Sequence, residues 1–159
     1  MIYIIAAILI VALDQITKFF IYDKVDLTVI SGILSFHSGF NRGAAWGILE
    51  GARVFFIIIT VLVVVGIIIY LKSGKVQSRL EKWALATMAG GALGNFIDRV
   101  WLGGVRDFIK VDFIDFPIFN VADCFVCIGA GLYILYAFSD TFKKKEETDV
   151  KLTETDGNE

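Results

Sequence analysis

Residues 83–102 read WALATMAGGALGNFIDRVWL, an apolar run that closes with an amide, a carboxylate and a guanidinium. The run matches the ~20 residues that a helix needs to cross a bilayer. Gly90, Gly91 and Gly94 give this helix a face of small residues, on which another helix backbone can approach closely. The stretch therefore predicts a membrane-spanning helix packed tightly against a neighbour.

The polar residues at the end of this run are Asn95, Asp98 and Arg99, at positions i, i+3 and i+4. Helix packing explains the glycines but not these side chains, because an ionised group in hydrocarbon costs at least ~2.5 kcal/mol. We expect Asp98 and Arg99 to belong to a network that can position a neighbouring group or a substrate carbonyl. In this interpretation Asp98 supports a site and does not perform its chemistry.

Three further runs match the first in length and apolar character. The four runs cover residues 2–22, 54–71, 83–102 and 116–138. Hydrophobic residues make up 57% of the 159-residue chain and the mean hydropathy is +0.72, whereas a soluble domain has roughly 45–50%. The sequence therefore predicts an all-α membrane protein, a bundle of four transmembrane helices that forms a single domain over residues 1–142.

Basic residues gather in two places, and connections rich in lysine and arginine stay cytoplasmic. The groups are Lys72, Lys75, Arg79 and Lys82 after the second run, and Lys143, Lys144 and Lys145 after the fourth. We therefore expect both termini in the cytoplasm and segments 23–53 and 103–115 outside. The first run lacks the basic start and cleavage site of a signal peptide, so we interpret it as a retained helix. Residues 143–159 are predicted to form a charged, disordered cytoplasmic tail.

Other polar residues interrupt the apolar runs at corresponding depths. Asp14 and Lys18 share a helix face in the first run and can form an ion pair, and Asn120 and Asp123 lie in the fourth. At 1.5 Å per residue, Asp14, Asp98 and Asp123 lie ~20, ~24 and ~30 Å from the cytoplasmic ends of their helices. The hydrocarbon core is ~30 Å thick. We therefore expect a polar layer in the outer part of the bilayer, and a buried active site within it.

Two segments outside the helices have features of strands. Residues 27–36 carry β-branched side chains around Ser31 and Gly32, which predicts a small extramembrane β-sheet. Residues 105–113 partly alternate apolar and polar side chains, which predicts a short strand or a surface segment. The stretch NRGAAWG, residues 41–47, indicates a turn, with Trp46 suited to the bilayer interface.

The return loop after the third helix can bring a second carboxylate to Asp123. Two carboxylates that lie close together cannot both ionise cheaply, so one keeps a proton and the pair can act as base and acid on one water molecule. This is the chemistry of aspartic peptide hydrolysis. Asp107 is the candidate partner, and Asp112 and Asp115 remain alternatives on spacing alone.

Other classes of function have weaker signals. Cys124 and Cys127 lie one helical turn apart and suggest a thiol oxidoreductase, but free cysteines in an apolar helix are often small hydrophobes. His37 is the only histidine, so we expect no metal site. The net charge of −2 does not indicate a nucleic-acid partner. A small transporter or channel that uses the acidic layer for protons is the other alternative.

Five motifs, taken in order, resemble those of the lipoprotein signal peptidases, also called signal peptidase II. They are DQITK, NRGAAWG, GALGNFIDR, VRDFI and FPIFNVAD, and the resemblance extends over residues 2–138 on a scaffold of four spans with an extramembrane sheet. It implies a membrane aspartic endopeptidase of the bacterial inner membrane. Such an enzyme removes the signal peptide of a prolipoprotein by cutting just before a diacylglyceryl-modified cysteine.

The resemblance also implies roles for individual residues. The catalytic aspartates of the family match Asp107 and Asp123. Its supporting polar residues match Asp14, Lys18, Asn41, Asn95, Asp98, Arg99 and Asn120. No metal or organic cofactor is implied. The implied partners are the lipidated prolipoprotein and membrane lipid, and we expect a monomer whose active site lies near the outer leaflet.

Overall fold

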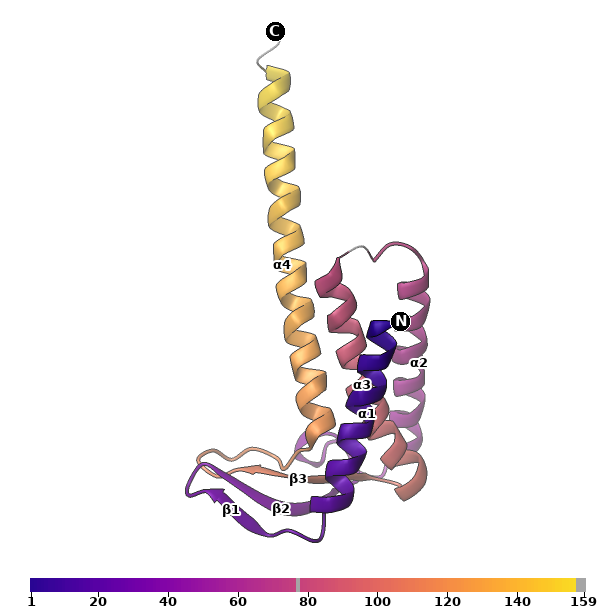
Figure 1. The fold of residues 1–159 in the computed structure, drawn as a ribbon, viewed down its shortest axis with the longest axis vertical. Coiled ribbons are helices and arrows are strands. Elements are labelled where there is room, and N and C mark those ends of the chain that lie inside the picture. Colours follow the sequence, from indigo (N-terminus) through magenta and orange to yellow (C-terminus); the bar gives the residue numbers. More distant parts are fainter. Residues whose placement is uncertain (77, 157–159) are drawn as a thin grey trace.

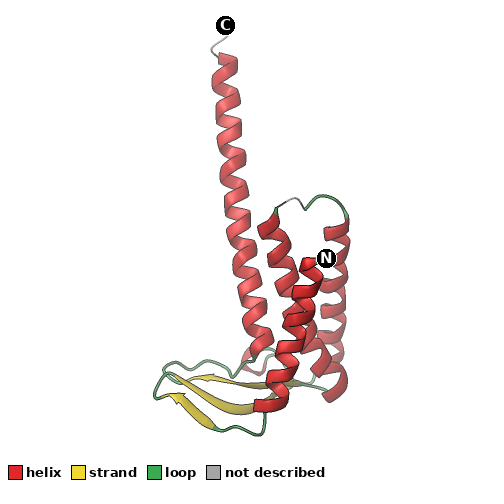
Figure 2. Ribbon diagram, viewed as in Figure 1, coloured by secondary structure: helices red, strands yellow, loops and turns green. Residues whose placement is uncertain are grey.

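The computed structural model describes the backbone of residues 1–76 and 78–156, and the side chains of that part up to residue 142. Within these residues the chain forms a helix bundle with a small β-sheet across one end (Figures 1 and 2). The helices are α1 (Ile2–Ile21), α2 (Arg53–Lys72), α3 (Arg79–Leu102) and α4 (Val121–Asp156). The strands are β1 (Leu27–Ile30), β2 (Leu34–Asn41) and β3 (Val105–Val111), and a short 3-10 helix, η1 (Ala45–Gly47), precedes α2.

The central helix is α3, which packs against α1, α2 and α4. A Cβ atom at Gly91 would lie 2.5 Å from the carbonyl oxygen of Ala122 in α4, and one at Gly94 would lie 2.6 Å from a carboxylate oxygen of Asp14 in α1. Both contacts therefore require a residue without a side chain. The prediction of a tightly packed glycine face is confirmed, and this face brings α1 and α4 to the polar end of α3.

Three of the described helices are long and apolar enough to cross a membrane, namely α1, α2 and the Val121–Phe142 part of α4. At 24 residues α3 is long enough, but it has charged residues near both ends and many glycines and alanines between them. A helix surrounded by other helices has less need of large apolar side chains than one that faces lipid. The predicted helix bundle with a small sheet is confirmed, together with three of its four predicted spans.

The sheet is antiparallel, in the order β1-β2-β3. Strands β2 and β3 pair so that Gly39 lies opposite Asp107 and Asn41 lies opposite Val105. The side chain of Phe108 in β3 is buried, with 1% of its surface exposed. Strands are thus confirmed in both segments where the sequence indicates them. The sheet lies across the end of the bundle (Figure 1), and β3, the strand that contains Asp107, contacts α1 and α3.

The fourth helix begins later than the predicted residue 116. The backbone of Phe119 exchanges hydrogen bonds with Ile109 of β3, at N···O distances of 3.0 and 2.8 Å. Pro117 also disfavours a helical conformation for the residue before it. The chain therefore stays extended beside β3 until Asn120, and α4 starts at Val121.

The same helix also continues beyond the predicted residue 138. Its backbone is helical to Asp156, through most of the tail that the sequence analysis predicts to be disordered. Extending a helix that is already nucleated fixes one residue for each hydrogen bond gained, which costs far less than starting a new one. The stable spanning segment thus provides the start that an isolated charged tail would lack.

The glycine contact between α3 and α4 can be tested with Gly91→Ala. The added methyl group would meet the Ala122 carbonyl and the backbone nitrogen of Val126, so we expect a loss of about 1–3 kcal/mol of stability. Gly131→Ala is the matched control, because a Cβ there meets nothing within 4 Å and an alanine favours the helix. Thermal unfolding in detergent should show a lower midpoint for the first variant only, and equal midpoints would contradict the packing argument.

Candidate active site

Asp107 and Asp123 come from different elements and meet through one amide. Asp107 lies in β3 and has 3% of its surface exposed, and Asp123 lies half-buried in the first turn of α4. Nδ2 of Asn120 donates a hydrogen bond of 2.6 Å to Oδ1 of Asp107. The backbone N–H of Asn120 donates to Oδ2 of Asp123 at 3.1 Å. The structure thus brings the two predicted carboxylates to either side of Asn120.

The start of α4 fixes the position of Asp123. Oδ1 of Asn120 accepts a hydrogen bond from the backbone N–H of Asp123 at 3.0 Å, and Asp123 accepts one from the backbone N–H of Asn120 in return. This reciprocal pair is a capping box, which satisfies two N–H groups at a helix start. Asp123 is therefore held both by its own backbone and by the residue before the helix.

A second amide, Asn95 of α3, joins the same cluster. Its Nδ2 donates to Oδ1 of Asp123 at 2.7 Å, and its Oδ1 accepts hydrogen bonds from Nδ2 of Asn120 at 3.0 Å and Nζ of Lys18 at 2.9 Å. Both oxygens of Asp123 therefore have hydrogen-bond donors. These hydrogen bonds stabilise the ionised form of the carboxylate, against the burial that disfavours it.

Lys18 is the cation at the centre of the buried polar layer. Its ammonium lies 2.9 Å from Oδ2 of Asp14 and 3.3 Å from Oδ2 of Asp98, and none of the three side chains is exposed. The predicted ion pair of Asp14 and Lys18 is confirmed. The other oxygen of Asp14 accepts the backbone N–H of Ala122 at 2.9 Å, so this pair also holds the start of α4.

Asp98 and Arg99 each position a neighbouring segment, but within the described residues they do so through separate partners and form no ion pair with each other. Adjacent residues on a helix point in different directions. Asp98 instead accepts hydrogen bonds from the guanidinium of Arg106 in β3, the shortest at 2.7 Å, and from the backbone N–H of Arg106 at 3.0 Å. Gln15 of α1 completes the group, donating to Asp98 at 3.2 Å and accepting from Arg106 at 2.9 Å.

Arg99 instead contacts the segment before α2. Its Nη2 donates to the carbonyl oxygen of Gly43 at 3.2 Å, and its guanidinium lies 4.7 Å from the ring centre of Phe56. Oδ1 of Asn41 accepts the backbone N–H of Gly43 at 2.9 Å, and the Asn41 side chain also hydrogen-bonds Asp107. The two predicted supporting residues therefore fix the stretch NRGAAWG next to Asp107.

This stretch forms one wall of a pocket of about 290 Å³ that includes Asp107. Asn41, Trp46, Pro117 and Ile118 are among its other lining residues. Trp46 has a φ of 55°, a left-handed conformation that few residues other than glycine adopt. The turn predicted at residues 41–47 is thus present, and it shapes the space in front of the buried carboxylate.

Burial raises the pKa of Asp107 from 3.8 to about 7. The charge of Asp123 contributes to this rise, whereas hydrogen bonds from Asn120 and Asn41 oppose it. A carboxyl group with such a pKa holds its proton over much of the acidic range and can donate it near neutrality. The site therefore contains one carboxyl group suited to keep a proton beside one that accepts hydrogen bonds on both oxygens.

The two alternative carboxylates lie away from this cluster. Asp112 accepts a hydrogen bond from Ser35 at 3.0 Å and lies 3.6 Å from Nζ of Lys110, on the exposed side of the sheet. Asp115 is exposed as well. Cys124 and Cys127 are free cysteines, the first half-buried and the second exposed on α4.

Gln15 and Arg106 belong to the site region but are missed by the sequence analysis. Gln15 lies within DQITK, and its spacing from Asp14 gave no sign that it would face the same way. Arg106 precedes Asp107 in the strand, so alternation places the two side chains on opposite faces. A search for a cation able to reach Asp98 from the neighbouring strand would have found Arg106.

Comparison with known proteins gives a consistent assignment. A family described as signal peptidase (SPase) II matches residues 6–139. A lipoprotein signal peptidase from Brevibacillus brevis is 47% identical over 148 residues, covering 90% of this chain and 98% of its own. The lipoprotein signal peptidase of Bacillus subtilis is 41% identical over 153 residues, covering 92% and 99%.

Solved structures agree with the sequence comparison. One described as a bacterial membrane enzyme, obtained by the in meso method at 2.3 Å resolution, has a TM-score of 0.84 and 39% identity, and the match covers 91% of this chain and 92% of that one. A second, at 1.9 Å resolution, has a TM-score of 0.79 and 38% identity, covering 87% and 93%. With a family match over most of its length and relatives this similar, the chain belongs to the signal peptidase II family, that of the lipoprotein signal peptidases.

Proposed function

We propose that this protein is a membrane aspartic endopeptidase that removes signal peptides from bacterial prolipoproteins. The observation that supports this most directly is the pair Asp107 and Asp123, joined through Asn120 at the end of an apolar helix bundle. The names of the relatives supply the substrate class. Asp107, with its raised pKa, is the proposed proton donor. Asp123, whose carboxylate accepts hydrogen bonds, is the proposed proton acceptor.

In the proposed mechanism a water molecule lies between the two carboxyl groups. As the water oxygen bonds to the scissile carbonyl carbon, Asp123 takes a proton from the water, and Asp107 gives its own proton to the carbonyl oxygen. When the C–N bond breaks, Asp123 passes its new proton to the leaving amine. Asp107 recovers a proton from the hydroxyl of the intermediate as the carbonyl forms again. The cycle ends with the starting protonation states and needs no metal or organic cofactor.

We also propose that α3 crosses the membrane with the three apolar helices and that both termini are cytoplasmic. Lys72, Lys75, Arg79 and Lys82, which lie at the end of α2, in the connection and at the start of α3, support this orientation. The sheet end has large exposed apolar residues, among them Ile33, Trp46, Ile48, Phe113 and Ile114, which suit contact with the outer surface of the bilayer. Asp107 then lies at the depth where the signal helix of a membrane-anchored substrate ends.

Replacing either aspartate with asparagine should abolish most of the cleavage. Asp107→Asn removes the proposed donor and Asp123→Asn the proposed base, each with little change of shape, so we expect turnover to fall by about 10²–10⁴-fold. The measurement is cleavage of a diacylglyceryl-modified precursor by purified protein in detergent or liposomes.

Asp112→Asn and Asp115→Asn are the matched controls, because they remove carboxylates from the same region but not from the cluster. Both should cleave at close to the rate of the unmodified protein. Thermal unfolding of each variant separates loss of chemistry from loss of fold. Substantial turnover by a folded Asp107→Asn or Asp123→Asn protein would remove that residue from the catalytic role.

The raised pKa of Asp107 makes a prediction about stability and pH. The folded state binds the proton more tightly than the unfolded state, so the resulting stability is fully present below about 3.8 and is lost as pH rises through about 7. The stability of the unmodified protein relative to Asp107→Asn should therefore decline between about pH 4 and about pH 7 and level off above that, whereas the comparison with Asp112→Asn should show no decline of this kind. Parallel curves for all three proteins would contradict the assignment of the proton to Asp107.

The lipid part of the proposal can be tested separately. A substrate held by both a signal helix and acyl chains reaches the site at a fixed depth, so an unlipidated precursor should be cleaved much more slowly than its diacylglyceryl-modified form. The comparison uses the same precursor, with and without the modification, at equal surface concentration in liposomes. Equal rates would contradict the proposed recognition of lipid but not the proposed roles of Asp107 and Asp123.

A further inference from the structure

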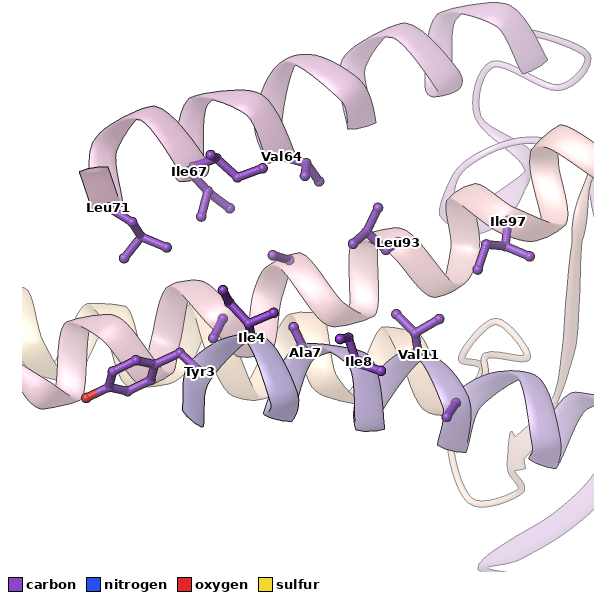
Figure 3. Close-up of a pocket in the computed structure, with 14 residues that line it drawn as sticks. Tyr3, Ile4, Ala7, Ile8, Val11, Val64, Ile67, Leu71, Leu93 and Ile97 are labelled. Carbon is purple, nitrogen blue, oxygen red and sulfur yellow. The ribbon is translucent and has the colours of Figure 1, made fainter. Parts of the chain in front are cut away.

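A groove extends between α1 and α2, with α3 as its floor. Figure 3 shows Tyr3, Ile4, Ile8 and Val11 of α1 facing Val64, Ile67 and Leu71 of α2 across Leu93 and Ile97 of α3. The groove has a volume of about 550 Å³. None of its lining residues also lines the pocket beside Asp107, so it is separate from the proposed active site.

The groove lies among the helices that cross the membrane, so hydrocarbon or another helix must cover it in a bilayer. Along α1 it extends from Tyr3 to Ala12, which is ~14 Å at ~1.5 Å per residue. Its lining is almost wholly apolar, which suits acyl chains.

Basic side chains lie at the end of the groove away from the sheet. Lys72 directly follows the lining residue Leu71, and Lys75 lies in the loop after it, both exposed. Lys82 is on the groove face of α3, one turn before Ala86 and in line with Ala89, since residues four or seven apart share a helix face. The acid nearest to these lysines in sequence is Glu81, in the first turn of α3, which is buried and accepts a hydrogen bond from Tyr70 at 2.8 Å.

We propose that this groove binds an anionic phospholipid, with acyl chains between α1 and α2 and the headgroup on Lys72, Lys75 and Lys82. Basic pockets between membrane helices are suited to anionic headgroups, and Lys72 and Lys75 are exposed beside the groove. Tyr3 carries the one polar side-chain atom among the lining residues, and nearly all of the lining surface is apolar. The bound lipid fills the space between two helices that otherwise meet mainly through α3 (Figure 3).

Native mass spectrometry of the full chain in detergent, titrated with phosphatidylglycerol or phosphatidylcholine, tests this proposal. The unmodified protein should retain phosphatidylglycerol in preference to phosphatidylcholine. Lys72→Gln with Lys82→Gln should weaken phosphatidylglycerol binding by about 25-fold, at about fivefold for each lysine. Lys24→Gln with Lys110→Gln, two lysines at the sheet end, is the control and should have little effect.

Ala89→Trp tests the groove itself, because the indole would occupy the space of the acyl chains and should reduce binding of phosphatidylglycerol more than tenfold. Ile69→Trp is its control, as Ile69 is exposed on α2 and does not line the groove. Both variants should still cleave precursor in detergent, since neither residue belongs to the dyad region.

Three results would overturn the proposal. Equal retention of the two lipids would contradict a site for an anionic headgroup. Equal retention of phosphatidylglycerol by Ala89→Trp and Ile69→Trp would contradict binding in the groove. Ala89→Trp could also leave lipid binding unchanged and instead abolish binding of a signal-helix peptide or formation of a dimer. Either result would assign the groove to that partner. If Ala89→Trp does not fold, the surface lysine variants still decide, because unchanged lipid binding in them contradicts the proposal.

Discussion

The rest of the site depends on one buried ammonium group, that of Lys18, held between the carboxylates of Asp14 and Asp98. Each carboxylate also binds a different element: Asp14 accepts the N–H of Ala122 at the start of α4, and Asp98 accepts the guanidinium of Arg106 in β3. A buried charge cluster adds little net stability, but removing one partner costs about 3–5 kcal/mol because a charge is left unpaired. Its effect is therefore to favour one arrangement of α1, α3, α4 and β3, because other arrangements leave a buried charge unpaired.

The same ammonium group determines how the amides point. An ammonium group can only donate, so the amide oxygen of Asn95 must face Lys18 and its NH₂ group must face Asp123. In Asn120 the amide oxygen accepts the N–H of Asp123, so its NH₂ group faces Asn95 and Asp107. Both amides therefore present donors to the two carboxyl groups. Lys18 thus determines the orientation of the hydrogen bonds that reach Asp107 and Asp123, the candidate dyad.

Much of this arrangement could be predicted because topology converts sequence position into depth. Chain direction alternates, so Asp14 and Asp98 near the ends of α1 and α3 and Asp123 at the start of α4 fall in one layer. Partners within a layer are harder to predict, since spacing along a helix gives a face but not the residue opposite. Asp98 was placed in a network with Arg99, its neighbour in sequence, although its partner is Arg106 across a turn. The choice of Asp107 over Asp112 likewise required the register of β3 against the helices.

The start of α4 illustrates why the remaining details need coordinates. By hydropathy the apolar run includes Phe116, Ile118 and Phe119, which gave a helix start several residues too early. Competition between two backbone pairings decides the real start: Phe119 bonds to Ile109 of β3, and the helix can begin only after the capping box at Asn120. Had the helix begun at residue 116, Asn120 could not cap it, and Asp123 would lie in its second turn without the N–H group that now holds it. The position of the candidate base is thus set by where the strand pairing ends.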